Sequence, residues 1–171
     1  MSVRILKVAF AVLALTGCAE APSSKFAPTA QLELSRVTLE PETARVMINR
    51  YRSTRGLRPL TMETKLTAAA ERHSTDLARA DRISHTGTDG SNPWHRVKLS
   101  GYRPLLAAEN VGAGQRSFEE VLQGWKESPG HDKNLLLADA THMGIALKTN
   151  PDSSYQTFWT LVLGKPARKV R

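Results

Sequence analysis

The sequence contains a single cysteine among 171 residues and no apolar run long enough to cross a bilayer. One cysteine cannot form an intramolecular disulfide, and it cannot supply the thiolates of a cysteine-based zinc finger. A disulfide-rich secreted scaffold and a zinc-finger fold are therefore excluded. Charged residues make up 23% and hydrophobic residues 40% of the chain, which excludes a wholly disordered protein and favours one globular domain.

The familiar catalytic signatures are also missing. The sequence has no His-Glu-x-x-His, no Gly-x-Ser-x-Gly and no glycine-rich phosphate loop ending in Lys-Ser or Lys-Thr. A thiol nucleophile is not expected either, because the one cysteine lies close to the N-terminus, outside the part of the chain that predicts a domain.

The first 17 residues have the pattern of an export signal. A short segment with Arg4 and Lys7 precedes the eight-residue apolar run 8–15, and in a helix this run covers only about 12 Å. The sequence Leu15-Thr16-Gly17-Cys18 resembles a bacterial lipobox, which implies cleavage before Cys18 and lipidation of its thiol. The alternative is an ordinary signal peptide with an incidental or buried free cysteine.

We therefore expect an exported lipoprotein attached to a membrane by its lipid. Ala19, rather than an aspartate, follows the lipidated position. In a cell with two membranes, this resembles a signal for delivery to the outer membrane, with the protein facing the periplasm.

Composition divides the remainder into three parts. Residues 18–40 are rich in Pro and Ser and predict a flexible tether, residues 41–164 predict the folded domain, and residues 165–171 form a basic tail. Loss of residues 1–17 lowers the formal charge from +8 to +6, and the tail carries four positive charges and no acid. Because the basic charge gathers in a tail, we expect no nucleic-acid partner.

Periodicity and capping residues predict the elements of the domain. Helices are expected from Pro41 to about Gly56, from about Met62 to Ala80, between Asn92 and Gly101, and after the capping box that starts at Ser117. Alternation predicts an edge strand at 143–147, a turn at 150–154 joins it to the next strand, and the two-sided apolar run 155–163 predicts a central strand. This pattern indicates an α+β fold with helices on both faces of a small, mainly antiparallel sheet.

Histidines and one glutamate beside tight turns are the best candidates for chemistry. His85, Glu109 and His131 fall in glycine-rich, loop-like contexts, although each one alone is as well explained by a structural role. His73 lies in the apolar stripe of its helix and is interpreted as a histidine at the edge of the core. His95 and His142 are interpreted as surface residues.

Taken together and in order, these segments resemble the CAP superfamily (cysteine-rich secretory proteins, antigen 5 and pathogenesis-related proteins, or SCP-like domains), in its cysteine-poor bacterial branch. The resemblance covers about residues 42–164 and implies a three-layer α-β-α sandwich. It rests on ten motifs, among them Ser84-His85-Thr86, Ala108-Glu109-Asn110-Val111, Gly124-Trp125, Ser128-Pro129-Gly130-His131 and Phe158-Trp159-Thr160.

The resemblance implies a cavity lined by His85, Glu109 and His131. Many relatives place a second acid where this chain has Ser128, and the preceding Glu127 need not face the same way because one helical step turns about 100°. The sequence leaves open whether Glu127 replaces that acid. The resemblance also implies that His85 and His131 could hold a divalent metal such as zinc, as a weak, open site.

Three functions are compatible with this set of residues. The leading hypothesis is a non-enzymatic binding module that takes a lipid, glycan or protein ligand in the cavity. The first alternative is a metal-assisted hydrolase of peptide or cell-wall substrates, with Glu109 as base. The second is a structural envelope lipoprotein in which the His/Glu cluster only stabilises the loops.

Overall fold

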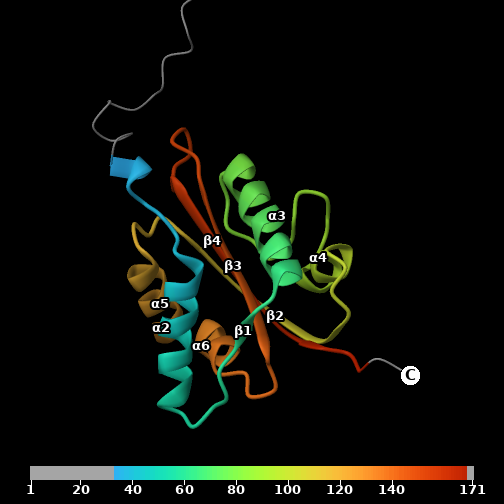
Figure 1. Ribbon diagram of the computed structural model, residues 1–171. Helices are drawn as coiled ribbons and strands as arrows, with labels where there is room; N and C mark the ends of the chain where they lie inside the picture. Colours follow the sequence, from blue (N-terminus) through green and yellow to red (C-terminus); the bar gives the residue numbers. More distant parts are fainter. Residues whose placement is uncertain (1–32, 169–171) are drawn as a thin grey trace, which may run out of the picture.

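The computed structural model describes residues 33–168 (Figure 1). The predicted signal peptide, Cys18 and most of the predicted tether lie outside the described residues, as do residues 169–171. None of the helices within residues 33–168 combines the length and apolar character needed to span a membrane. The elements are α2 (Pro41–Ser53), β1 (Thr61–Met62), α3 (Thr64–Ala80), α4 (Pro93–Leu99), β2 (Pro104–Ala113), α5 (Phe118–Glu127), α6 (Pro129–Leu135), β3 (His142–Thr149) and β4 (Thr157–Pro166).

The four strands form one sheet in the order β1-β3-β4-β2. β4 is antiparallel to both β2 and β3, and only the two-residue β1 runs parallel to its neighbour. The prediction of a mainly antiparallel sheet with the last strand at its centre is confirmed. A central strand is covered on both faces, which explains why β4 carries large apolar side chains at consecutive positions.

Helices cover both faces of the sheet (Figure 1). Trp159 and Leu161 of β4 pack with α2, α5 and α6 in the larger core cluster. Phe158 and Val162 point to the opposite face and pack against residues of α3 and α4. The chain therefore has the predicted three-layer α-β-α architecture.

Two capping predictions agree with the structure. The Asn92 side chain accepts a hydrogen bond from the His95 N–H at the start of α4, and Ser117 accepts from the Glu120 N–H at the start of α5. Gly101 follows α4 with a φ of 82°, a conformation that glycine adopts without strain.

Four local predictions differ from the structure. The strand predicted at the edge, 143–147, lies between β1 and β4 as β3, and the outer strands are β1 and β2. The second helix begins at Thr64 rather than Met62, because the Thr61 and Glu63 N–H groups bond to β3 and its preceding residue instead of continuing a helix. Glu109 lies in a ten-residue strand, β2, and His131 lies in a helix, α6, so neither lies in a loop. His73 is fully buried, not at the edge of the core.

The ends of the domain extend past the predicted boundaries. Leu34 and Val37, within the segment assigned to the tether, are buried in the larger core cluster. At the other end β4 continues to Pro166, and the ammonium of Lys165 pairs with the Asp139 carboxylate at 2.9 Å. The fold therefore includes residues on both sides of 41–164.

Candidate functional site

Glu109 projects from the edge strand β2, which pairs with β4 along nearly its whole length. Its carboxylate is 1% exposed, and both oxygens are occupied. Oε2 accepts a hydrogen bond from Nη2 of Arg96 at 2.7 Å, and Oε1 accepts from Nδ1 of His85 at 2.9 Å. Nε2 of His73 lies 3.6 Å from Oε1. The negative charge is thus neutralised by a buried guanidinium that is itself only 2% exposed.

His85 lies in the loop after α3 and is the outermost member of this group, with 51% of its side chain exposed. Because Nδ1 is hydrogen-bonded to the carboxylate, Nε2 is the ring nitrogen that remains available to a ligand. Arg96 also donates from Nη2 to the His85 carbonyl oxygen at 3.0 Å. One guanidinium therefore fixes both the backbone of His85 and the carboxylate that orients its ring.

His131 lies in the first turn of α6, next to β2. The Asn110 amide donates to the His131 carbonyl oxygen at 3.0 Å, and the Asn134 amide donates to the Glu109 carbonyl oxygen at 3.0 Å. These bonds attach α6 to β2 and set the position of the imidazole. Burial, and secondarily the neighbouring His85, lower the pKa of His131 below its ordinary value. The His131 ring is therefore neutral at neutral pH.

His85, His131 and Ser128 line one cleft of about 450 Å³. Its other walls include apolar side chains from β2 and α5, with Val111 and Trp125 among them. The Trp125 indole N–H donates to the Val111 carbonyl oxygen inside the protein, so this buried ring forms the floor of the cleft, while Ile83 is the exposed apolar side chain in its wall.

Neither Glu109 nor Glu127, the two acids considered for the cavity, lines this cleft. Glu109 lies behind His85 and does not line it. Glu127 is exposed and accepts a hydrogen bond from the Gln123 amide at 2.7 Å on the outer face of α5. Glu127 does not replace the acid that is missing at Ser128.

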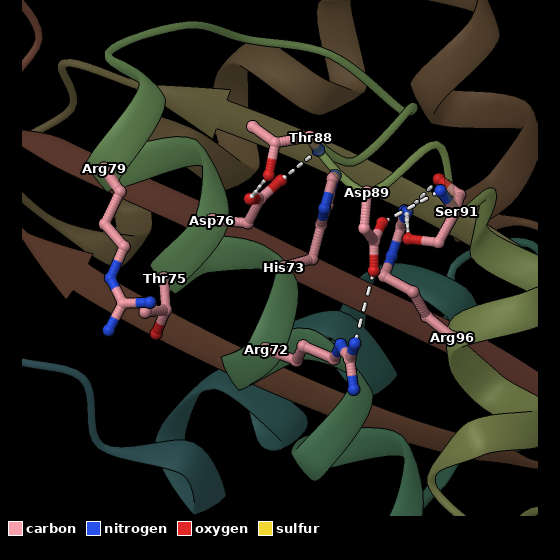
Figure 2. A pocket seen from close by; sticks show the side chains of 9 residues that line it. All are labelled: Arg72, His73, Thr75, Asp76, Arg79, Thr88, Asp89, Ser91 and Arg96. Carbon is pink, nitrogen blue, oxygen red and sulfur yellow. Dashed lines mark hydrogen bonds and ion pairs between the residues drawn. The ribbon is translucent and has the colours of Figure 1, made fainter.

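A second cavity of about 360 Å³ lies beside the buried ends of His73 and Arg96 (Figure 2). Figure 2 shows that its walls come from α3, α4 and the loop between them, and that two carboxylates tie the loop down. Asp76 accepts bonds from the N–H and hydroxyl of Thr88, and Asp89 pairs with the Arg72 guanidinium. These contacts hold the loop that carries His85.

His73 and Arg96 are the site residues that sequence reasoning did not assign. The His73 Nε2–H donates to the Ser84 carbonyl oxygen at 2.8 Å, while Nδ1 has no partner among the described residues. Burial lowers the pKa of His73, although Glu109 acts in the opposite direction. A signal existed for Arg96, because it adjoins the apolar Val97 in a short helix and a buried arginine requires an anionic partner.

The donor set does not fit the metal centre implied by the resemblance. Among residues 33–168, no group of three or more His, Cys, Asp or Glu side chains is arranged to hold a metal ion. Nδ1 of His85 and both Glu109 oxygens already take part in hydrogen bonds, which leaves His85 Nε2 and the His131 ring as free donors. Two imidazoles are fewer than the three protein ligands of an open catalytic zinc site.

Comparison with known proteins identifies relatives of the domain. The model of the cysteine-rich secretory protein family (CAP) matches residues 46–163. The Bacillus subtilis protein YkwD is 32% identical over 99 residues, which cover 58% of this chain and 38% of YkwD. The chain thus spans well under half the length of this curated relative.

Two solved structures share the fold. An extracellular SCP-domain protein from Bacillus anthracis is 26% identical with a TM-score of 0.65, over 73% of this chain and 40% of that one. An outer surface protein from Borrelia burgdorferi is 21% identical with a TM-score of 0.66, over 74% of this chain and 92% of that one. At 21% identity the second likeness concerns the fold alone.

Proposed function

The chain belongs to the cysteine-rich secretory protein (CAP) family, and from this premise we propose that it is an exported lipoprotein whose CAP domain binds a ligand without catalysing a reaction. The domain is held at the envelope by lipidated Cys18 and, in a cell with two membranes, faces the periplasm from the outer membrane. Export is supported by the extracellular protein from Bacillus anthracis that shares its fold at 26% identity.

The observation that carries the binding function is the state of Glu109. A carboxylate that acts as general base must be within reach of substrate or water, and the Glu109 carboxylate is 1% exposed and does not line the cleft. Both oxygens of Glu109 are buried and bonded, one to Arg96 and one to His85. The carboxylate therefore orients His85 and balances a buried charge, which are structural tasks.

The cleft favours an amphipathic ligand. His85 Nε2, the His131 ring and the Ser128 hydroxyl offer hydrogen bonds, while the exposed Ile83 side chain offers apolar surface. A lipid with a small polar head matches both kinds of surface, since binding sites combine an apolar wall with a few polar groups that orient the ligand. A glycan would use only the polar groups, and a protein partner would require contacts beyond a cleft of about 450 Å³.

The test is retention of endogenous lipid by the purified full chain, measured by mass spectrometry after extraction from envelopes. His131→Ala is the diagnostic variant, because its side chain makes no hydrogen bond within residues 33–168 and its loss leaves no buried partner. We expect at least a tenfold loss of bound lipid with an unchanged melting temperature. His95→Ala, at an exposed histidine outside the cleft lining, is the matched control and should retain wild-type lipid.

Other outcomes point to the two alternative functions. Cleavage of peptide or cell-wall substrates that is lost both with EDTA and in His131→Ala would replace the binding function with hydrolysis. Equal ligand content in wild type and His131→Ala would refute ligand binding in the cleft. A lowered melting temperature as the sole effect would favour the structural lipoprotein.

The anchor is tested separately, with Cys18→Ser. We expect this variant to lose lipid labelling at residue 18, while ligand retention by the cleft is unaffected. Undiminished labelling in Cys18→Ser would contradict the lipoprotein assignment.

A further inference from the structure

One side of the molecule, around α4 and the start of β2, exposes apolar and basic side chains together. Trp94, Leu99 and Leu105 are three of the six large apolar side chains that are exposed within residues 33–168, and they fall within twelve consecutive residues. The cationic side chains of Lys98 and Arg103 are interspersed with them and are also exposed. We refer to Trp94, Lys98 and Arg103, which line one groove, as the Trp94 surface; Leu99 and Leu105 belong to the same segment but are not among the residues that line it.

A groove of about 380 Å³ runs through this surface. It is lined by Trp94, Lys98 and Arg103 among others, and no acidic side chain of residues 33–168 contributes to it. Scattered exposed hydrophobic residues are ordinary in proteins, but an exposed tryptophan that shares an open groove with two basic residues has the composition of an interfacial contact.

The chain end adds positive charge at the same place. The Ala167 N–H donates to the Arg103 carbonyl oxygen at 2.8 Å, and Ala167 lines the groove. Figure 1 shows the chain running from the end of β4 past the start of β2. Arg168 follows directly and is exposed, and the sequence continues with Lys169-Val170-Arg171. Arg168 therefore adds an exposed positive charge next to a residue that lines the groove.

We propose that the Trp94 surface docks on a membrane rich in anionic phospholipid. A tryptophan ring is stabilised at the level of the headgroups, where its apolar body and its N–H are both accommodated. Lys and Arg near an anionic leaflet each strengthen binding about fivefold. The exposed Trp94 ring favours a lipid surface over a soluble polyanion, because an apolar ring gains more from the headgroup region than from a polyanion.

This docking is a second function of the domain and does not depend on a ligand in the cleft. It also does not depend on Cys18: a lipid anchor raises the local concentration of the domain at a membrane, whereas the Trp94 surface orients the domain on it.

Tryptophan fluorescence reads this contact directly. The chain has three tryptophans. Trp94 is 44% exposed, while Trp125 and Trp159 are 2% and 0% exposed. The full chain is mixed with two kinds of vesicle, both with brominated acyl chains. One kind is phosphatidylcholine alone, and the other contains about 40% phosphatidylglycerol to represent a strongly anionic leaflet. Trp94→Phe supplies the background emission of the two buried rings.

We expect bromine quenching and a blue shift of the Trp94 emission with anionic vesicles, and little change with phosphatidylcholine. The double variant Lys98→Gln/Arg103→Gln should bind anionic vesicles more weakly. We expect the ratio of vesicle-bound to free protein, measured by Trp94 quenching, to fall about 25-fold. Arg50→Gln/Lys148→Gln is the matched control, since it removes the same charge from two exposed residues outside the groove and should match wild type. His131→Ala should also match wild type, which separates this contact from the function of the cleft.

Three results would overturn the proposal. Trp94 emission that does not respond to anionic vesicles excludes membrane docking. Equal quenching in phosphatidylcholine, or in Lys98→Gln/Arg103→Gln, shows that the anionic headgroups and the basic side chains play no part. A shift produced by heparin and not by vesicles assigns the surface to an anionic glycan.

Discussion

Replacing Glu109 by glutamine tests whether this residue is structural or catalytic. The change removes one negative charge and keeps nearly the same shape. The new amide can still accept from Arg96 with its oxygen and donate to His85 Nδ1 with its nitrogen. What is lost is the charge that balances a guanidinium only 2% exposed.

The expected cost follows from burial. An ion pair at 2.7 Å with both side chains at or below 2% exposure is almost fully withdrawn from water. Removing one partner from such a pair typically costs about 3–5 kcal/mol, because the other charge stays buried without compensation. The hydrogen bonds retained by glutamine favour the lower end, so we expect about 3 kcal/mol of lost unfolding free energy.

A double-mutant cycle isolates the pair. Unfolding free energies are measured in urea for Glu109→Gln, Arg96→Met and the double variant, using the emission of the buried Trp125 and Trp159. Arg96→Met also loses the bonds to the Ser91 and His85 carbonyl oxygens, so its own cost exceeds that of the pair. The double variant should be more stable than the sum of the single costs predicts, by about 2 kcal/mol.

The opposite result is equally informative. Catalytic groups are often held in arrangements that cost stability, so replacing a catalytic base commonly leaves a protein unchanged or more stable. If Glu109→Gln were neutral or stabilising, or if the coupling to Arg96 were below about 0.5 kcal/mol, the structural role assigned to Glu109 would be wrong.

Two further predictions concern the interior. Burial lowers the pKa of His73, so His73 of the unfolded chain is protonated first as the pH falls, and the unfolding free energy should decline below about pH 6.5. His73→Gln keeps a donor for the Ser84 carbonyl oxygen and removes the titrating group, so its urea midpoints between about pH 5 and 8 should depend less on pH than those of the wild type. Identical pH profiles would contradict this. Gly144→Ala should abolish folding as judged by circular dichroism, because its methyl group would collide with the backbone of Thr67 in α3. The control is Gly124→Ala, whose methyl group meets no atom within 4 Å; it should raise the unfolding free energy by about 0.5–1 kcal/mol. A folded Gly144→Ala protein would refute the close approach of α3 to β3.

The elements that could be predicted from sequence are those with local chemical signals. Asn92 and Ser117 cap helices by accepting hydrogen bonds from residues three positions ahead, so both partners lie close together in the sequence. β4 is identified by apolar residues on both faces, which only a covered central strand requires.

The missed elements depend on distant partners. β2 contains alanines, Glu109 and Asn110, which are poor strand formers, and it is a strand because nine of its residues pair with β4. The seven-residue α6 is too short for a periodic signal and is held by the amides of Asn110 and Asn134. In both cases tertiary contacts override a weak local preference.

The candidate site also combines residues that could be identified from the sequence with contacts that could not. The resemblance to a family supplied His85, Glu109 and His131, but not the relation between them. Sequence spacing could not reveal that Arg96 neutralises Glu109, since the two residues are 13 positions apart in different elements and only the pairing of β2 turns Glu109 towards α4. That contact decides the chemistry, because it changes Glu109 from a candidate base into a buried counter-ion.

The cleft and the Trp94 surface therefore select ligands by different physical means. The one carboxylate next to the cleft is already paired, and the lowered pKa of His131 keeps its ring neutral, so hydrogen bonding and apolar contact dominate there. The Trp94 surface carries uncompensated cations, so its binding must weaken as salt screens charge over about 8–10 Å. Raising the ionic strength should release Trp94 from anionic vesicles while the cleft retains its ligand. If vesicle binding and ligand retention were lost at the same ionic strength, the cleft and the Trp94 surface would not be two independent binding sites.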